Sequence, residues 1–185
     1  MASEQARARG TFLGRVFGAA ALRAATYEDV EADRGATAQA VVVVVLSGLA
    51  AGVGARGFGG GEIGDVVFFA LLALAAWAGW AVLTYQLGTR IMPEQQTRAD
   101  VGQLLRTLGF ASAPGIVRVA GIVPQVSRAV FVVAAVWMLL AMIVAVRQAL
   151  DYRSTRKAVA VCVVGWLLAI AFAVVIGSLL GPGVS

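Results

Sequence analysis

The sequence predicts an all-α membrane protein, a bundle of five transmembrane helices preceded by a short amphipathic helix. Of its 185 residues, 60% are hydrophobic and 14% charged, whereas soluble domains carry roughly 45–50% apolar and about 25% charged residues. Several charge-free apolar runs reach the length of about 20 residues that a membrane-crossing helix needs. The runs are continuous rather than alternating, which indicates helices and not barrel strands.

The chain divides into a cytoplasmic tail and a membrane domain. The tail, with its interfacial helix, covers residues 1–35, and the five-helix domain covers residues 36–185. The predicted spans are residues 36–55, 66–88, 104–123, 129–146 and 158–180.

Residues 104–123 are the ambiguous span, because they contain Pro114 and Arg118. They form either a fifth span or a re-entrant hairpin. If they span, twelve of the fifteen basic residues fall on one side and three on the other; if they do not, the split is ten to five. Basic residues favour the cytoplasmic side. We therefore predict five spans in the cell (inner) membrane, with a cytoplasmic N-terminus and an extracytoplasmic C-terminus.

Arg118 has two interpretations within this topology. It lies 14 residues beyond Leu104, which is roughly 21 Å along an α-helix. Its head group is thus predicted to extend outward to the nearby membrane surface. The alternative is an arginine that lines a polar pocket together with Gln125.

The tail contains an amphipathic pattern. Its apolar residues share one helical face: Leu13, Val16, Phe17, Ala20 and Ala24. Arg15 is predicted on the opposite face. The pattern predicts an interfacial helix with its apolar face in the lipid boundary, or a helix packed on the cytoplasmic ends of the spans.

An acidic segment follows the tail helix. Thr26 is predicted as a helix N-cap with Asp29 in the capping-box position, so the first spanning helix is expected to begin near Tyr27. The acidic residues are Glu28, Asp29, Glu31 and Asp33. They either bind a metal or pair with the basic loops 90–106 and 147–157, and pairing is favoured.

Small and aromatic residues mark the spans. Gly48 and Gly52 form a GxxxG pair, the usual sign of close helix approach. Trp77, Trp80 and Trp137 lie near the middle of their spans. They are predicted to pack between helices; the alternative is a hydrophobic ligand pocket lined by all three.

The composition restricts the available chemistry. There is no His and a single Cys, Cys162, so no catalytic, metal-binding or cofactor-binding residue is predicted. The basic residues flank apolar spans, which indicates topology and lipid contact rather than nucleic acid.

The order of several motifs resembles the Yip-domain family, the bacterial relatives of the Rab-interacting Yip membrane proteins. The chain has YEDV at 27–30, GFASAP at 109–114, Trp137, and RQAL at 147–150. The resemblance covers roughly residues 12–180. It implies five spans and a cytoplasmic N-terminus; eukaryotic relatives bind prenylated Rab GTPases, act in ER–Golgi vesicle traffic and associate with one another.

The predicted function is that of a non-enzymatic integral membrane protein that organises or shapes the bilayer. Its expected partners are membrane lipids and either itself or another membrane protein. The alternative is a small oligomeric transporter or channel for a neutral or anionic solute. The candidate interaction positions are Tyr27, Glu28, Asp29, Trp77, Trp80, Pro114, Arg118 and Trp137.

Overall fold

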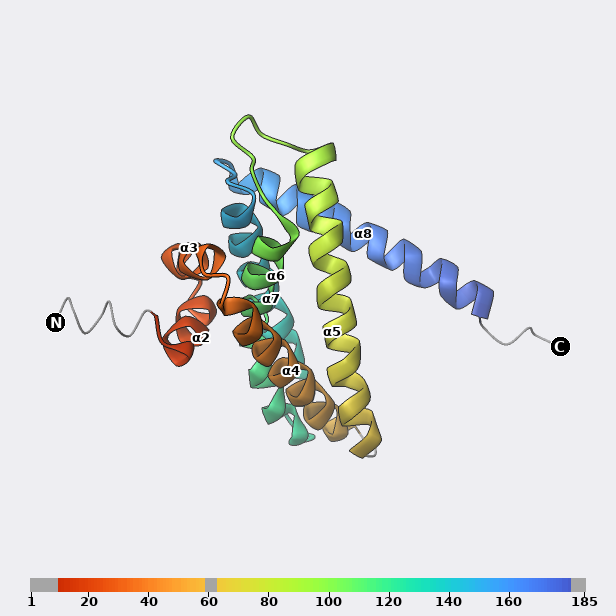
Figure 1. Ribbon diagram of the computed structural model, residues 1–185. Coiled ribbons are helices and arrows are strands. Elements are labelled where there is room, and N and C mark those ends of the chain that lie inside the picture. Colours follow the sequence, from red (N-terminus) through yellow and green to blue (C-terminus); the bar gives the residue numbers. More distant parts are fainter. Residues whose placement is uncertain (1–9, 59–62, 181–185) are drawn as a thin grey trace.

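The computed structural model describes residues 10–58 and 63–180, and every regular element within these ranges is a helix (Figure 1). The elements are α2 (Phe12–Ala20), α3 (Ala24–Ala32), α4 (Ala36–Ala55), η1 (Arg56–Phe58), α5 (Ile63–Gln86), η2 (Leu87–Ile91), α6 (Val101–Phe110), η3 (Ala113–Ile122), α7 (Ser127–Ala149) and α8 (Thr155–Leu180). The predicted all-α class is confirmed.

Three helical segments in the described part of the chain are long and apolar enough to cross a membrane. They are Ala36–Ala55, Val66–Ile91 and Ser127–Ala149. These segments coincide with three of the five predicted spans. The last predicted span, residues 158–180, lies within helix α8.

Helices α4 and α5 approach each other closely at the GxxxG pair. A Cβ atom on Gly48 would lie 2.8 Å from Cα of Ala70, and one on Gly52 would lie 2.7 Å from Cα of Val66. Neither site has room for a side chain. The spacing therefore serves packing within the bundle, the more frequent use of this motif.

Residues 104–123 do not form one continuous helix, so the prediction of a single 20-residue helix is wrong. The α-helix α6 ends at Phe110, and the 3₁₀ helix η3 begins at Ala113. Pro114 explains the break, because it has no N–H to continue the ladder and its ring would collide with the carbonyl of Phe110. Pro114 is itself buried at the start of η3.

The broken helix α6–η3 nevertheless runs the whole length of α4 in the same direction. Gly109 packs against Ala40, Gly115 against Ser47, and Gly121 against Gly57 in η1. Ten α-helical and ten 3₁₀ residues extend over about 35 Å. The two ends of the segment lie at opposite ends of α4, which differs from a re-entrant hairpin.

Among the side chains of α8 that the structure describes, those of its first turns pack on the bundle. Ala158, Val161 and Cys162 are buried, whereas Trp166 and Leu167 are exposed. In Figure 1 the helix is inclined to α5, and its C-terminal end lies far from the other helices.

The N-terminal helices are separate from the first long helix, which corrects two predictions. Helix α3 begins at Ala24 with Arg23 at its N-cap, and the buried Thr26 does not cap it. A break follows α3, where the carboxylate of Asp33 accepts a hydrogen bond from the N–H of Gly35 (2.8 Å). The long helix α4 therefore starts at Ala36 and not near Tyr27.

Candidate functional site

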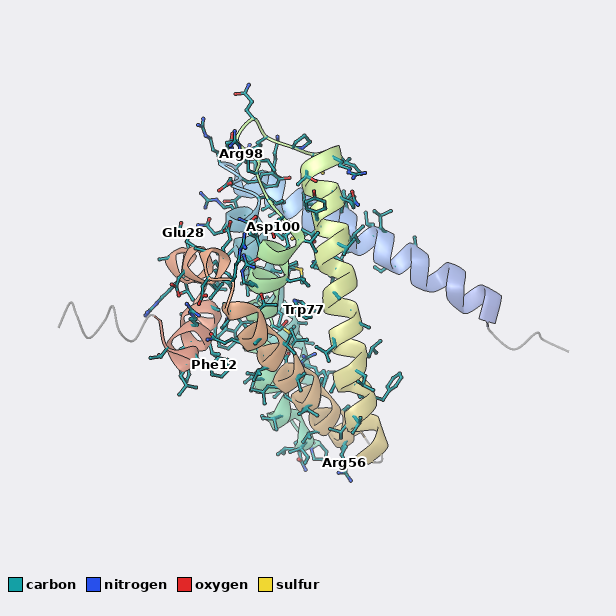
Figure 2. The ribbon with its side chains drawn as sticks, in the orientation of Figure 1. Phe12, Glu28, Arg56, Trp77, Arg98 and Asp100 are labelled. Atoms are coloured by element: carbon teal, nitrogen blue, oxygen red, sulfur yellow. The ribbon has the colours of Figure 1, made fainter. Side chains whose placement is uncertain are left out.

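Helices α2 and α3 form a compact unit on the flank of the bundle, here called the N-terminal cap (residues 12–32). Helix α3 packs against α6 and α7, and the labelled Phe12 and Glu28 mark the cap in Figure 2. Tyr27 is fully buried, and its hydroxyl donates to the carbonyl of Ala19 (3.0 Å). Val30 is also fully buried. These two side chains join α2 to α3 and α3 to the bundle.

Arg15 connects the cap to α4, although we predicted it on the outer face of α2. It is only 5% exposed. Its guanidinium lies 2.8 Å from Asp29 and 2.8 Å from Asp33, and donates to Gln39 in α4 (3.1 Å). The hydrogen bond from Arg15 holds the pKa of Asp33 below its usual value. A buried guanidinium requires such partners, which is why Arg15 turns inward.

Arg106 of α6 caps the C-terminal end of α3. Its Nε donates to the carbonyls of Val30 and Glu31, both at 3.1 Å, and the side chain is 6% exposed. A cation placed at unpaired carbonyls complements the helix dipole. Gln103 donates to the carboxylate of Glu31 (3.1 Å) as well. The acidic segment was predicted to pair with the basic loops, but in the part of the chain that the structure describes Asp29 and Asp33 pair with Arg15 of α2, and the Glu31 carboxylate accepts its hydrogen bond from the neutral Gln103.

Glu28 contacts α7 instead of a basic side chain. Its carboxylate accepts a hydrogen bond from the amide of Gln148 (2.7 Å). The four acidic residues therefore separate toward three different helices. In the described part of the chain, no group of three or more His, Cys, Asp or Glu residues is placed to hold a metal ion.

Two large apolar side chains remain on the outer surface of α2. Leu13 is 63% exposed and Phe17 is 71% exposed. Phe12 and Val16 pack against the core. The predicted apolar face is thus divided between the bundle and the surroundings. The helix packs on the bundle, as one of the two interpretations predicted, and it presents Leu13 and Phe17 outward.

Each of the three candidate tryptophans contacts a different helix. The indole of Trp77 donates to the carbonyl of Leu105 in α6 (2.9 Å), and that of Trp137 donates to the carbonyl of Ala20 in α2 (2.7 Å). The ring of Trp80 packs at Gly165 of α8. This arrangement matches the packing role predicted for them and does not bring the three into one pocket.

Arg118 turns inward along η3, so the predicted outward extension is wrong. Its Nε donates to the carbonyl of Gly115 (2.9 Å), and its Nη2 donates to the carbonyl (3.0 Å) and hydroxyl (2.7 Å) of Ser47. Ser47 lies seven residues before Gly54, which packs against the Arg118 backbone. Gly115 also packs tightly against the sulfur of Met138 in α7. Arg118 therefore links η3 to the middle of α4 in a closely packed region, which does not favour transport past it.

Comparison with known families adds to this geometry. The model of the Yip1 domain matches residues 20–176, most of the chain. The chain belongs to the Yip1 domain family. No curated protein and no solved structure matches it.

The Yip1 domain match includes most, but not all, of the site. Tyr27, Glu28, Asp29, Pro114 and Arg118 fall inside the matched residues. The exposed positions on α2 lie before residue 20 and thus outside the match. The outer face of the cap at Leu13 and Phe17 therefore lies outside the matched residues.

Several residues of the site were missed by sequence reasoning. Arg15, Arg106 and Ser47 each make buried contacts with residues 14 to 76 positions away. The acidic segment predicted basic partners, but the neighbouring sequence did not indicate which basic residues these would be. Gln148 was visible only as part of the RQAL motif.

The Glu31 carboxyl group makes docking of the cap depend on pH. Burial raises the pKa of Glu31 to about 7, above the usual value of about 4.3. The carboxyl group of Glu31 therefore binds its proton more tightly when the cap is docked than when it is detached. The resulting stabilisation of the docked cap is complete below about pH 4 and is lost as the pH rises through about 7. We expect α3 amides, corrected for intrinsic exchange rates, to be better protected from hydrogen exchange at pH 5 than at pH 8.

The Glu31→Gln variant is expected to remove most of this pH dependence. Glu28→Gln is the matched control, because its amide can still bond to Gln148 and the pKa of Glu31 remains raised by burial. An equal pH dependence in wild type and Glu31→Gln would contradict the prediction.

Proposed function

We propose that this member of the Yip1 domain family is a non-enzymatic membrane protein that contacts the bilayer through the outer face of its N-terminal cap and thereby organises the membrane. The observation that carries the proposal is the pair of exposed side chains Leu13 and Phe17 on a helix whose one arginine, Arg15, faces inward. Apolar side chains on a docked surface helix insert into the headgroup and acyl boundary.

The contacts of the cap favour a rigid lipid-binding surface. Two ion pairs, the Tyr27 hydroxyl and the Arg106 cap fix α2 and α3 relative to α4 and α6. Leu13 and Phe17 are therefore held together on one rigid element. Membrane lipids are its proposed partners. A second copy of the chain or another membrane protein is proposed to bind at the same exposed face.

We further propose that the chain crosses the cell (inner) membrane five times, with its N-terminus in the cytoplasm and its C-terminus on the extracytoplasmic side. The parallel course of α6–η3 along the whole of α4 supports a crossing at residues 104–123. The charge distribution supports the orientation, with Arg98 and Arg56 at opposite ends of the bundle (Figure 2). Near the Arg98 end, the backbone N–H of Arg153 and the ammonium group of Lys157 contact Glu94 of the same loop, and basic residues favour the cytoplasmic side.

The polar side chains of the site support a structural rather than a catalytic role. Arg15, Arg106 and Arg118 all engage carboxylates, hydroxyls or carbonyls of other helices. Each of these side chains holds two or more elements together. The chemistry of the described site is that of a scaffold.

Depth-dependent quenching tests the lipid contact. A Phe17→Cys variant in a Cys162→Ala background is labelled with an environment-sensitive fluorophore and reconstituted into vesicles containing lipids with a nitroxide on the upper acyl chain. We expect strong quenching at position 17, and we expect Leu13→Glu to reduce it several-fold by placing a charge in the same apolar face.

Glu28→Cys provides the control position, because Glu28 is exposed on the same cap but polar. A fluorophore at position 28 is expected to be quenched weakly. Equal quenching at 17 and 28, or no response to Leu13→Glu, would overturn the proposed contact.

A further inference from the structure

A shallow groove lies at the start of α7, at the opposite end of α7 from Gln148, which contacts the cap. It has a volume of about 660 Å³ and is lined by Pro124, Gln125, Arg128, Ala129, Val132 and Val133. The hydroxyl of Ser127 donates to the carbonyls of Gly121 and Val123, and Gly57 packs against Ser127. The groove is therefore built on the packed junction of η1, η3 and α7.

The groove combines a cation with an apolar wall. Arg128 is exposed, and no carboxylate in the described part of the chain pairs with it. One helical turn further, about 6 Å along α7, Val132 is 59% exposed and Val133 is 58% exposed. Val136 continues the same exposed face.

The order of these groups along α7 matches the order of groups in a phospholipid. A helix that enters a membrane places its first residues at the headgroup level and the next turns beside acyl chains. Arg128 and Gln125 then stand at the level of a phosphate, and the valines at the level of the first methylene groups. A guanidinium is the side chain best suited to phosphate oxygens, through paired charge-assisted hydrogen bonds.

We propose that this groove binds one phospholipid with an anionic headgroup. Its phosphate contacts Arg128 and Gln125, and an acyl chain lies along Val132 and Val136. The volume falls within the range of about 300–1,000 Å³ that is typical of small-molecule sites. This site is separate from the cap, which contacts α7 at Trp137 and Gln148, so either proposal can fail without the other.

Native mass spectrometry of the full-length protein tests the proposal. The protein, purified in a mild detergent, is titrated with phosphatidylglycerol or with phosphatidylcholine, and bound lipid is counted. We expect one saturable phosphatidylglycerol site, weaker binding of phosphatidylcholine, and an approximately tenfold loss of phosphatidylglycerol affinity in Arg128→Gln, which corresponds to about 1.4 kcal/mol.

Two further variants separate the groove from general charge attraction. Ala129→Trp fills the groove without changing the charge, and Ala129 is exposed, so folding is expected to be preserved. Arg56→Gln removes the same charge at the same end of the bundle but outside the groove (Figure 2). We expect Ala129→Trp to weaken binding as Arg128→Gln does, and Arg56→Gln to leave it unchanged.

Three results would overturn the proposal. Equal losses in Arg56→Gln and Arg128→Gln would indicate attraction to surface charge alone. Unchanged binding in Ala129→Trp would place the lipid elsewhere. Displacement of the lipid by millimolar inorganic phosphate would identify a site for a soluble anion and not for a lipid.

Discussion

Replacing Gly54 by leucine is expected to prevent normal assembly of the bundle. A Cβ atom at this position would overlap the backbone carbonyl of Arg118 and lie 3.1 Å from the ring of Phe131. The obstructing atoms belong mainly to the backbone of η3, so they cannot move aside by a change of rotamer. Overpacking of a core typically costs about 1–3 kcal/mol, and more where the backbone must shift.

Thermal unfolding in detergent, followed by size-exclusion chromatography, measures this effect. We expect Gly54→Leu to lower the apparent melting temperature by about 5 °C or more, or to abolish the monodisperse peak. Gly79→Leu is the matched control, because a Cβ at Gly79 in α5 meets no atom within 4 Å. Equal stability of the two variants would show that α4 and η3 do not pack as described.

Impermeant labelling of single cysteines is expected to place the two ends of α7 on opposite sides of the membrane. The positions are Val126→Cys, Thr155→Cys and Ser185→Cys in the Cys162→Ala background. Ser127 is unsuitable because it is 1% exposed and hydrogen-bonded, whereas Val126 and Thr155 are exposed. In intact cells we expect labelling at 126 and 185 and none at 155, as the proposed five spans require.

Lysed cells provide the control, since all three positions should then react. Labelling at 155 alone in intact cells would contradict the proposal, because it requires either a segment 104–123 that does not cross the membrane or the inverse orientation. Labelling of 126 and 155 together would show that α7 does not cross the membrane. That result would contradict the five-span proposal, because α7 is the most apolar of the three candidate spans.

The sequence was informative where the deciding signal is local. Hydropathy located α4, α5 and α7 to within a few residues, because a charge-free apolar run of about 20 residues has few alternatives to a buried or membrane helix. The Gly48 and Gly52 spacing predicted close helix packing for the same reason. Pro114 marked residues 104–123 as ambiguous, but we did not predict the helix break that its covalent geometry produces.

The directions of the arginines were not predictable in this way. Arg15 was expected on the outer face of α2 and Arg118 at the membrane surface, yet both point inward. Each direction depends on acceptors from other helices: Asp29 and Asp33 for Arg15, and Ser47 for Arg118. A helical wheel shows which residues share a face, but it does not show which neighbour that face will meet.

By itself, the sequence determined the all-α class, the positions of three long apolar helices and the family resemblance that the Yip1 domain match confirms. The tertiary structure alone decided that the cap docks with Leu13 and Phe17 outward and that the broken segment α6–η3 lies parallel along α4. The physical reason is the range of the interactions. Hydropathy and helix breaking act over neighbouring residues, whereas burial of a guanidinium depends on partners as far as 71 to 76 residues away.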